Sequence, residues 1–304
     1  MVKKAAKPKK DTLNSPDELA QAGAYFKENA SLLSPPVMRA AYSDRMAWVC
    51  ASMAHLAYDP FEAEDRKAYW LLAAKLKGGG FRLLGTFNSR ETDTQAFLAA
   101  NDEYAVLAFR GTEKDWRDIQ TDIRAKRVTT PEGKVHAGFN AGYASVAKQI
   151  EKALLRVEGY PLFITGHSLG GALATVATQM LESNPKFAYQ IAACYTFGSP
   201  RVGNADYDEH IKSSFYRVVN TTDIVTVVPL LTMGFVHIGD VRFLEREDKK
   251  FRRSIPTLRR LWAFLTAFSR LVTDHKIVEY RRKMGKIAEH RNPGTESDSR
   301  MHSR

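Results

Sequence analysis

The chain has 304 residues, with 45 Lys and Arg against 34 Asp and Glu, which gives a formal net charge of +11. Only two cysteines occur, too few for the disulfide framework of small secreted domains. No apolar run reaches the roughly 20 residues of a transmembrane helix. The positive charge favours anionic surfaces, but the basic residues form no recognisable nucleic-acid motif, so we expect no nucleic-acid partner.

Both ends of the chain are polar. The lysine-rich start is followed by polar residues instead of an apolar core, which is not the pattern of a signal peptide. We interpret residues 1–18 as a basic, disordered tail and residues 290–304 as a polar tail, with a single domain at 19–289. This organisation predicts a cytoplasmic or peripherally membrane-associated protein, with export by a route that needs no N-terminal signal left open.

Strand and helix patterns alternate along the chain. The first strong strand pattern is Tyr104–Phe109, and it ends in a turn-like segment, Arg110 to Thr112. Residues 138–158 then repeat apolar side chains at helical spacing and stop at a Gly-Tyr-Pro sequence. Alternation of this kind predicts an α/β fold with a mainly parallel central sheet.

The most informative segment is Leu162–Gly171, an apolar run that enters a G-x-S-x-G sequence centred on Ser168. A helix-like stretch, 172–181, follows it directly. A strand that turns sharply into a helix forces its middle residue into a strained conformation, and the glycines on either side remove Cβ atoms that would clash. Ser168 is thereby presented above a helix N-terminus, which favours the negative charge that develops during nucleophilic attack. We therefore predict that Ser168 is a nucleophile.

Nucleophilic attack on a carbonyl needs two hydrogen-bond donors for the oxyanion. One is normally the N–H of the residue after the nucleophile, here Leu169. The second should come from a loop after an earlier central strand, and Thr112 after Tyr104–Phe109 fits this position. A plain tight turn over Arg110 to Thr112 is the alternative.

A serine also needs a base and an acid, which follow it in the order serine, acid, histidine in this kind of fold. Residues 215–220 read as a strand, and Asp223 lies on the loop after it, so we predict Asp223 as the acid. Asp206 and Asp208 compete, but they lie in a polar segment that resembles the start of a solvated helix.

Four histidines follow Asp223. His290 and His302 fall in the polar tail, which offers nothing to hold a base rigid. His237 lies in a strand-like run, 235–239, whereas His275 lies where a loop should meet a new helix. We favour His275 as the base and keep His237 as the alternative.

A basic amphipathic helix is predicted over about 254–272, with Ser254 as its cap. Its apolar face carries Trp262 and several leucines, and its arginines, among them Arg259 and Arg260, lie opposite. Such a helix can cover the core of its own domain, which is the commoner arrangement, or lie in a membrane interface.

Taken together, these segments resemble the class 3 lipases of the α/β-hydrolase fold, typified by fungal triacylglycerol lipases and feruloyl esterases. Several matching segments in the right order make the resemblance specific: Asp44–Tyr58, Ala105–Thr112, Val135–Phe139, Thr165–Gly171, Tyr195–Asn204, Arg217–Pro229 and Asp274–Tyr280.

The resemblance implies the same site that the residues indicate. It places the nucleophile on Ser168, the acid on Asp223, the base on His275 and the oxyanion residue on Thr112, and a further family histidine on His237. It implies no metal and no cofactor. The residues corresponding to the family's usual lid, Glu113–Lys134, are polar, so we expect only weak activation by an oil interface.

We therefore expect a serine ester hydrolase whose substrate is a lipid ester such as an acylglycerol. A phospholipase A-type enzyme or a short-chain or feruloyl-type esterase would use the same machinery. A third interpretation, a catalytically inert membrane-binding module, is disfavoured by the intact set of site residues. Peripheral contact with an anionic membrane is expected from the charge.

Overall fold

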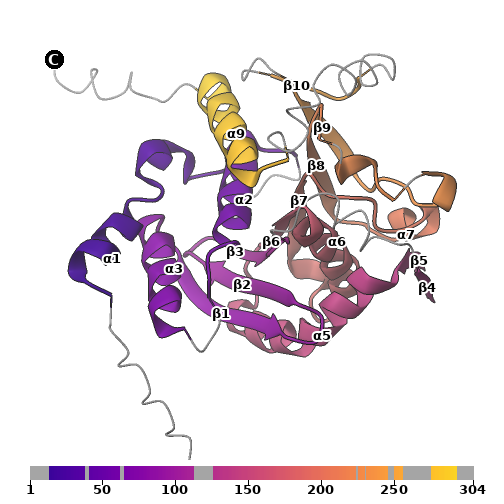
Figure 1. Ribbon diagram of the computed structural model, residues 1–304, viewed down its shortest axis with the longest axis horizontal. Coiled ribbons are helices and arrows are strands. Elements are labelled where there is room, and N and C mark those ends of the chain that lie inside the picture. Colours follow the sequence, from indigo (N-terminus) through magenta and orange to yellow (C-terminus); the bar gives the residue numbers. More distant parts are fainter. Residues whose placement is uncertain are drawn as a thin grey trace, which may run out of the picture.

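The computed structural model describes residues 14–37, 41–61, 65–112, 126–223, 225–229, 231–245, 250–255 and 275–292 (Figure 1). Its α-helices are α1 Pro16–Gly23, α2 Asp44–Leu56, α3 Arg66–Gly78, α5 Ala137–Leu154, α6 Leu169–Glu182, α7 Ala205–Glu209 and α9 Ile277–Arg291. Its strands are β1 Arg82–Ser89, β2 Thr94–Ala100, β3 Ala105–Phe109, β4 Arg127–Thr130, β5 Gly133–His136, β6 Leu162–His167, β7 Ile191–Phe197, β8 Ser214–Asn220, β9 Asp240–Leu244 and β10 Phe251–Arg252.

Eight strands form the central sheet in the order β1-β2-β3-β6-β7-β8-β9-β10. The five strands from β3 to β9 run parallel, and β1, β2 and β10 add antiparallel pairs at the two edges. The predicted α/β fold with a mainly parallel sheet is confirmed. Because parallel strands end at the same edge of a sheet, the turns that follow β3, β6 and β8 are brought to one side of the molecule.

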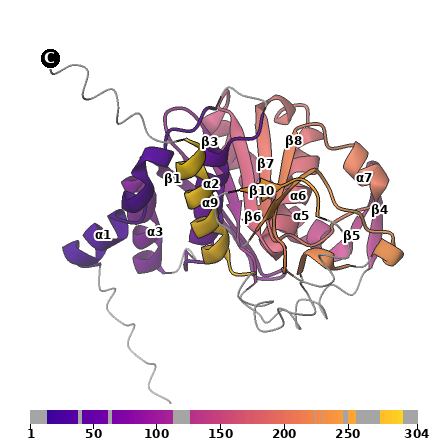
Figure 2. The same cartoon turned by 90° about the horizontal axis from the view of Figure 1, so that it is seen from above.

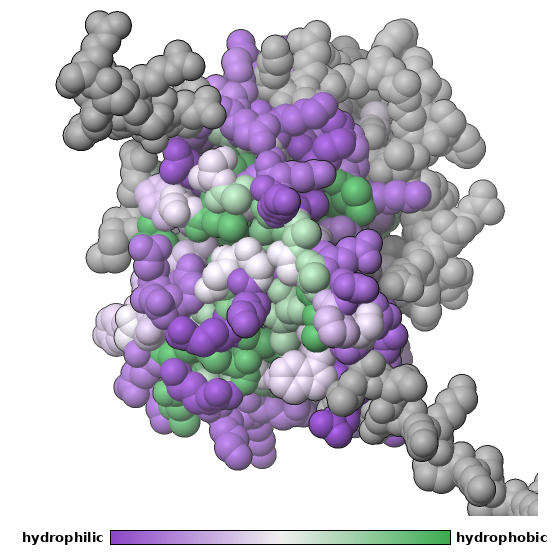
Figure 3. Space-filling view, turned by 90° about the vertical axis from the view of Figure 1, so that its left-hand side faces the viewer, coloured by the Kyte–Doolittle hydropathy of each residue, from purple (hydrophilic) through white to green (hydrophobic). Residues whose placement is uncertain are grey.

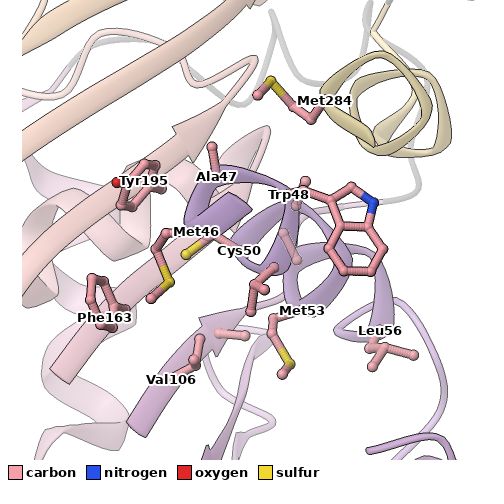
Figure 4. Close-up of a cluster of buried hydrophobic side chains, with 14 of the residues drawn as sticks. Met46, Ala47, Trp48, Cys50, Met53, Leu56, Val106, Phe163, Tyr195 and Met284 are labelled. Atoms are coloured by element: carbon pink, nitrogen blue, oxygen red, sulfur yellow. The ribbon is translucent and has the colours of Figure 1, made fainter. Parts of the chain in front are cut away.

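Helices cover both faces of this sheet (Figures 1 and 2). On one face, α2 packs Met46 and Met53 over the strands and also contacts α9 through Met284 (Figure 4). On the other face, α5 and α6 enclose a second apolar cluster. Alternate residues of β3 supply the two clusters, Val106 to the first and Leu107 to the second, as the two-residue period of a strand requires.

The face formed by α1 and α3 carries a shallow groove of about 600 Å³, and apolar side chains gather on this side within a hydrophilic rim (Figure 3). Its lining includes Leu19, Ala73 and the half-exposed Trp70. The two helices approach closely here, since a Cβ on Gly78 would lie 1.9 Å from the carbonyl oxygen of Gly23. The small residues of the groove are thus explained by helix packing.

Two tail boundaries differ from the sequence prediction. Helix α1 begins at Pro16, inside the segment 1–18, because Ser15 and Glu18 form a reciprocal capping box. At the other end, α9 continues to Arg291 and so includes His290, the first residue of the predicted tail at 290–304. The capping box thus fixes the start of α1, which packs against α3, and contacts with α2 hold α9.

The strand expected over residues 235–239 is wrong. Only Val236 makes an isolated bridge, to Gly203, and strand β9 begins at Asp240. Gly234 and Gly239 both adopt positive φ, +76° and +79°, which interrupts an extended run on either side of His237. The predicted helix at about 254–272 lies outside the described residues beyond Ile255, and so does most of the expected lid, 113–125. Within the described ranges, no helix is both long and apolar enough to cross a bilayer.

Candidate active site

Ser168 occupies a sharp turn between β6 and α6. Its φ of 57° and ψ of −129° lie in a region that non-glycine residues rarely adopt. A Cβ on Gly166 would lie 2.1 Å from the carbonyl oxygen of Gly170, and one on Gly170 would lie 2.4 Å from that of Phe109. Both glycines of the G-x-S-x-G sequence are therefore required for β6, the turn and α6 to pack this closely.

Three predicted site residues come together at this turn. The Nε2 atom of His275 lies 2.9 Å from Oγ of Ser168, and its Nδ1 atom lies 2.9 and 3.0 Å from the two carboxylate oxygens of Asp223. The Asp223 side chain is fully buried, whereas that of His275 is 14% exposed. With the proton on Nδ1, the imidazole donates to Asp223 and presents an acceptor to the serine hydroxyl.

The acid is held by more than the imidazole. Tyr280, in the first turn of α9, donates its hydroxyl to Oδ2 of Asp223 at 2.6 Å, and the Val225 N–H donates to Oδ1 at 3.0 Å. The Tyr280 oxygen in turn accepts the N–H of Asn220 at 2.9 Å. Gly198, at φ +57°, leaves the space for this cluster, because a Cβ there would lie 2.5 Å from Oδ2 of Asp223. Sequence reasoning missed Tyr280, although it lies five residues after the predicted base.

His167, next to the nucleophile, supports the base. Its Nε2 atom bonds to the carbonyl oxygen of His275, and its Nδ1 atom lies 2.7 Å from the hydroxyl oxygen of Tyr58. Because a carbonyl can only accept, Nε2 carries the proton and Tyr58 donates to Nδ1. Burial lowers the pKa of His167 well below its usual value, so the ring is neutral. Its ring lies against that of His275, with the centroids 4.6 Å apart and the planes tilted by 37°.

The predicted oxyanion residues lie on two adjoining segments. Leu169 is the first residue of α6, so its N–H belongs to the free end of that helix. Thr112 follows the loop after β3, and Gly111 brings this loop against the serine turn, since a Cβ on Gly111 would lie 2.5 Å from the carbonyl oxygen of His167.

The competing residues lie elsewhere. Asp206 and Asp208 belong to α7, where Asp206 accepts from the side chain of Asn204 at 2.8 Å and Asp208 accepts from the backbone of Gly239. His237 lies between the Val236 bridge and β9, and the imidazole at Ser168 is that of His275. In the part of the chain that the structure describes, no group of three or more His, Cys, Asp or Glu side chains is arranged to hold a metal.

Comparison with known proteins finds similarity to lipases. The family model for lipase (class 3) matches residues 106–233. A lipase of Rhizopus niveus is 33% identical over 171 residues, which cover 52% of this chain and 43% of that protein. The secreted mono- and diacylglycerol lipase A of Penicillium cyclopium is 34% identical over 162 residues, 50% of this chain and 52% of that protein. The chain thus spans about half the length of the curated relatives it matches.

Solved structures show the same fold. The crystal structure of a mono- and diacylglycerol lipase from Aspergillus oryzae superposes with a TM-score of 0.59, at 24% identity, over 72% of this chain and 85% of that one. Lipase II from Rhizopus niveus gives a TM-score of 0.56 at 22% identity, over 86% of this chain and 94% of the other. At these identities the structural similarity supports the fold alone.

Proposed function

We propose that the chain, which matches the class 3 lipase model over residues 106–233, is a lipase of that family, a serine hydrolase that cleaves carboxylic esters of acylglycerols or related lipids. The observation that carries this proposal is the pair of contacts made by His275, with Nε2 at 2.9 Å from the Ser168 hydroxyl and Nδ1 at 2.9 Å from Asp223. Nothing in this arrangement calls for a cofactor, because a hydroxyl, a base and a carboxylate suffice for acyl transfer.

The first half of the reaction forms an acyl-enzyme. The Ser168 oxygen attacks the ester carbonyl carbon while its proton passes to Nε2 of His275, and the buried Asp223 carboxylate stabilises the imidazolium. When the tetrahedral intermediate collapses, Nε2 returns the proton to the leaving alcohol oxygen. In the second half, water takes the place of the serine hydroxyl, and the carboxylic acid and free Ser168 are released.

The negative charge on the carbonyl oxygen needs donors that are already in place. We assign the N–H of Leu169, at the start of α6, and that of Thr112, on the loop after β3. The positive end of the α6 dipole adds to their effect. A neutral His167 beside the base puts no further positive charge in the site, which leaves the cationic form to His275 alone.

Two other functions use the same atoms. The polar sequence of 113–134 favours a phospholipase A-type enzyme or a short-chain or feruloyl-type esterase over an enzyme that depends on an oil interface. The relative named as a mono- and diacylglycerol lipase favours acylglycerols, which is why we place these first. Within this proposal, segment 254–272 is the candidate contact with an anionic lipid surface if it does not cover the core of its own domain, and the protein is cytoplasmic or attached peripherally to a membrane, with export by a route that needs no N-terminal signal left open. Loss of liposome co-sedimentation in Trp262→Ala and Arg259→Ala/Arg260→Ala variants is the test of that contact.

The substrate class is tested with 4-nitrophenyl esters from acetate to palmitate, a triacylglycerol and a phosphatidylcholine. We expect the wild type to hydrolyse at least one of them about 10³-fold or more faster than Ser168→Ala, because the alanine variant lacks the attacking atom. Ser183→Ala, a surface serine at the end of α6, is the matched control and should keep full activity. A wild type no faster than Ser168→Ala on every substrate would instead support an inert binding module.

A further inference from the structure

Helix α9 turns two polar side chains toward the end of β8. They are Tyr280 and Lys283, one helical turn apart, and α9 lies beside α2 on the side of the sheet seen at the top of Figure 1. Lys283 is only 6% exposed. Lysine is almost never buried to this extent without a specific partner, so its surroundings need a physical account.

The partner of Lys283 is Asn220, the last residue of β8. The Nζ atom donates to Oδ1 of Asn220 at 2.9 Å and lies 3.6 Å from a carboxylate oxygen of Glu279 on the preceding turn of α9. Asn220 itself is fully buried. Its N–H donates to the Tyr280 hydroxyl, and its carbonyl oxygen accepts the N–H of Asp223 at 3.0 Å. Every polar group of Asn220 named here is thus tied either to α9 or to the acid.

We propose that Lys283 is a positioning residue for the triad. Its ammonium group fixes the Asn220 side chain, Asn220 fixes the turn that leads to Asp223, and the Asp223 carboxylate consequently stays aligned with Nδ1 of His275. The inference rests on the proposed function of the Ser168 site. It adds a residue outside 106–233, the region that the family model matches.

The neighbouring residues of α9 argue against a purely structural role. Met284 and Ile287 are buried on the same helix and pack in the apolar cluster with α2. A methionine or leucine in place of Lys283 would fill similar space without desolvating a charge, which is a cost of burial that apolar residues do not carry. The buried ammonium of Lys283 bonds to Asn220, which precedes the turn that carries Asp223. We therefore attribute its burial to the positioning of that turn.

The test is a double-mutant cycle with Lys283→Met and Asn220→Ala, measured on the ester that the wild type cleaves best. Each single variant should lower kcat about tenfold with KM unchanged, because the acid is misplaced while the substrate site is intact. The double variant should be no slower than the slower single variant, because both changes break the same link. Ile287→Ala is the matched control, expected to lower Tm while keeping kcat.

A second readout is independent of any substrate. The Nδ1 proton of His275, bonded to Asp223, should give a downfield proton NMR resonance in the wild type and in Ile287→Ala, and this resonance should move upfield or be lost in Lys283→Met. Losses of kcat that multiply in the double variant, or an unchanged resonance in Lys283→Met, would overturn the proposal. A wild type that shows the resonance but cleaves no ester would contradict the proposed function. In that case the resonance of Lys283→Met alone would test the role of Lys283.

Discussion

The nucleophile and the acid–base pair are built in different ways. Ser168 is placed by residues within a few positions of it, the end of β6, two glycines and the start of α6. Asp223 and His275 lie 52 residues apart, and they meet because α9 returns to the end of β8 through Tyr280 and Lys283. One half of the site is thus local in sequence, while the other depends on long-range packing.

This difference predicts how each half fails. A change at a glycine of the local half should strain the backbone and destabilise the folded protein. A change in the long-range half should leave a folded protein whose acid or base is misplaced or wrongly charged. Four substitutions, ordered by the size of their expected effect, test this contrast.

The largest effect is expected for Gly166→Ala. The added Cβ would lie 2.1 Å from the carbonyl oxygen of Gly170, and backbone atoms on both sides cannot yield. We expect a loss of stability of about 4 kcal/mol or more, measured by urea unfolding or as loss of soluble protein. Gly23→Ala is the control, since its Cβ would meet only an ordinary contact at 3.9 Å. A stable Gly166→Ala protein would show that the serine turn does not depend on this glycine.

Asp223→Asn should act on chemistry while the fold survives. The amide keeps the shape of the side chain but cannot stabilise the imidazolium, and it favours the wrong tautomer of His275. We expect kcat to fall by about 10³ to 10⁴ while Tm changes little. Asp206→Asn, on α7, is the matched control and should retain activity. A comparable loss in Asp206→Asn would show that the acid has been misassigned.

Tyr280→Phe should give an intermediate result. It removes the donor to Oδ2 of Asp223 and leaves the buried N–H of Asn220 without its acceptor, so both activity and stability should fall. We expect about a tenfold lower kcat and a loss of about 1–2 kcal/mol in the free energy of unfolding. Unchanged kinetics would mean that Asp223 stays in position without the hydrogen bond from Tyr280 of α9.

The same contrast explains what the sequence could predict. The serine turn, α6 and the strand before Asp223 follow from local patterns, and the choice of His275 over His237 follows from its place before a helix. The parallel sheet follows from alternation of strands and helices. These features depend on spacing over a few residues, which a single sequence displays.

Other features depend on which distant residues meet, and spacing does not show this. The burial of Lys283, the bond from Tyr58 to His167 and the role of Asn220 appear only once α9 and α2 are packed on the sheet. The strand wrongly expected around His237 has a local cause, because its flanking glycines adopt positive φ. The two glycines that flank this apolar run were thus evidence in the sequence against a continuous strand.

The smallest effect is expected for the contact between α2 and α9, and it should appear as a pH dependence of the free energy of unfolding. His55 on α2 bonds to the Tyr25 hydroxyl at 2.8 Å, and Arg281 of α9 covers the Tyr25 ring. Burial, with the Arg281 charge as the second cause, lowers the pKa of His55 from 6.5 to about 4. The unfolded chain therefore binds more protons than the folded chain between these pH values, so stability is complete above pH 6.5 and is lost as pH falls toward 4.

His55→Gln should remove this part of the acid sensitivity, because glutamine keeps an acceptor for Tyr25 but does not titrate. Partial exposure of His55 limits the expected difference in free energy of unfolding between pH 7 and pH 5 to about 1 kcal/mol. The neutral, buried His167 contributes acid sensitivity of the same sign to both proteins and so cancels in the comparison. Urea unfolding curves at the two pH values provide the measurement. If wild type and variant lose equal stability on acidification, the contact between α2 and α9 is not pH-dependent through His55.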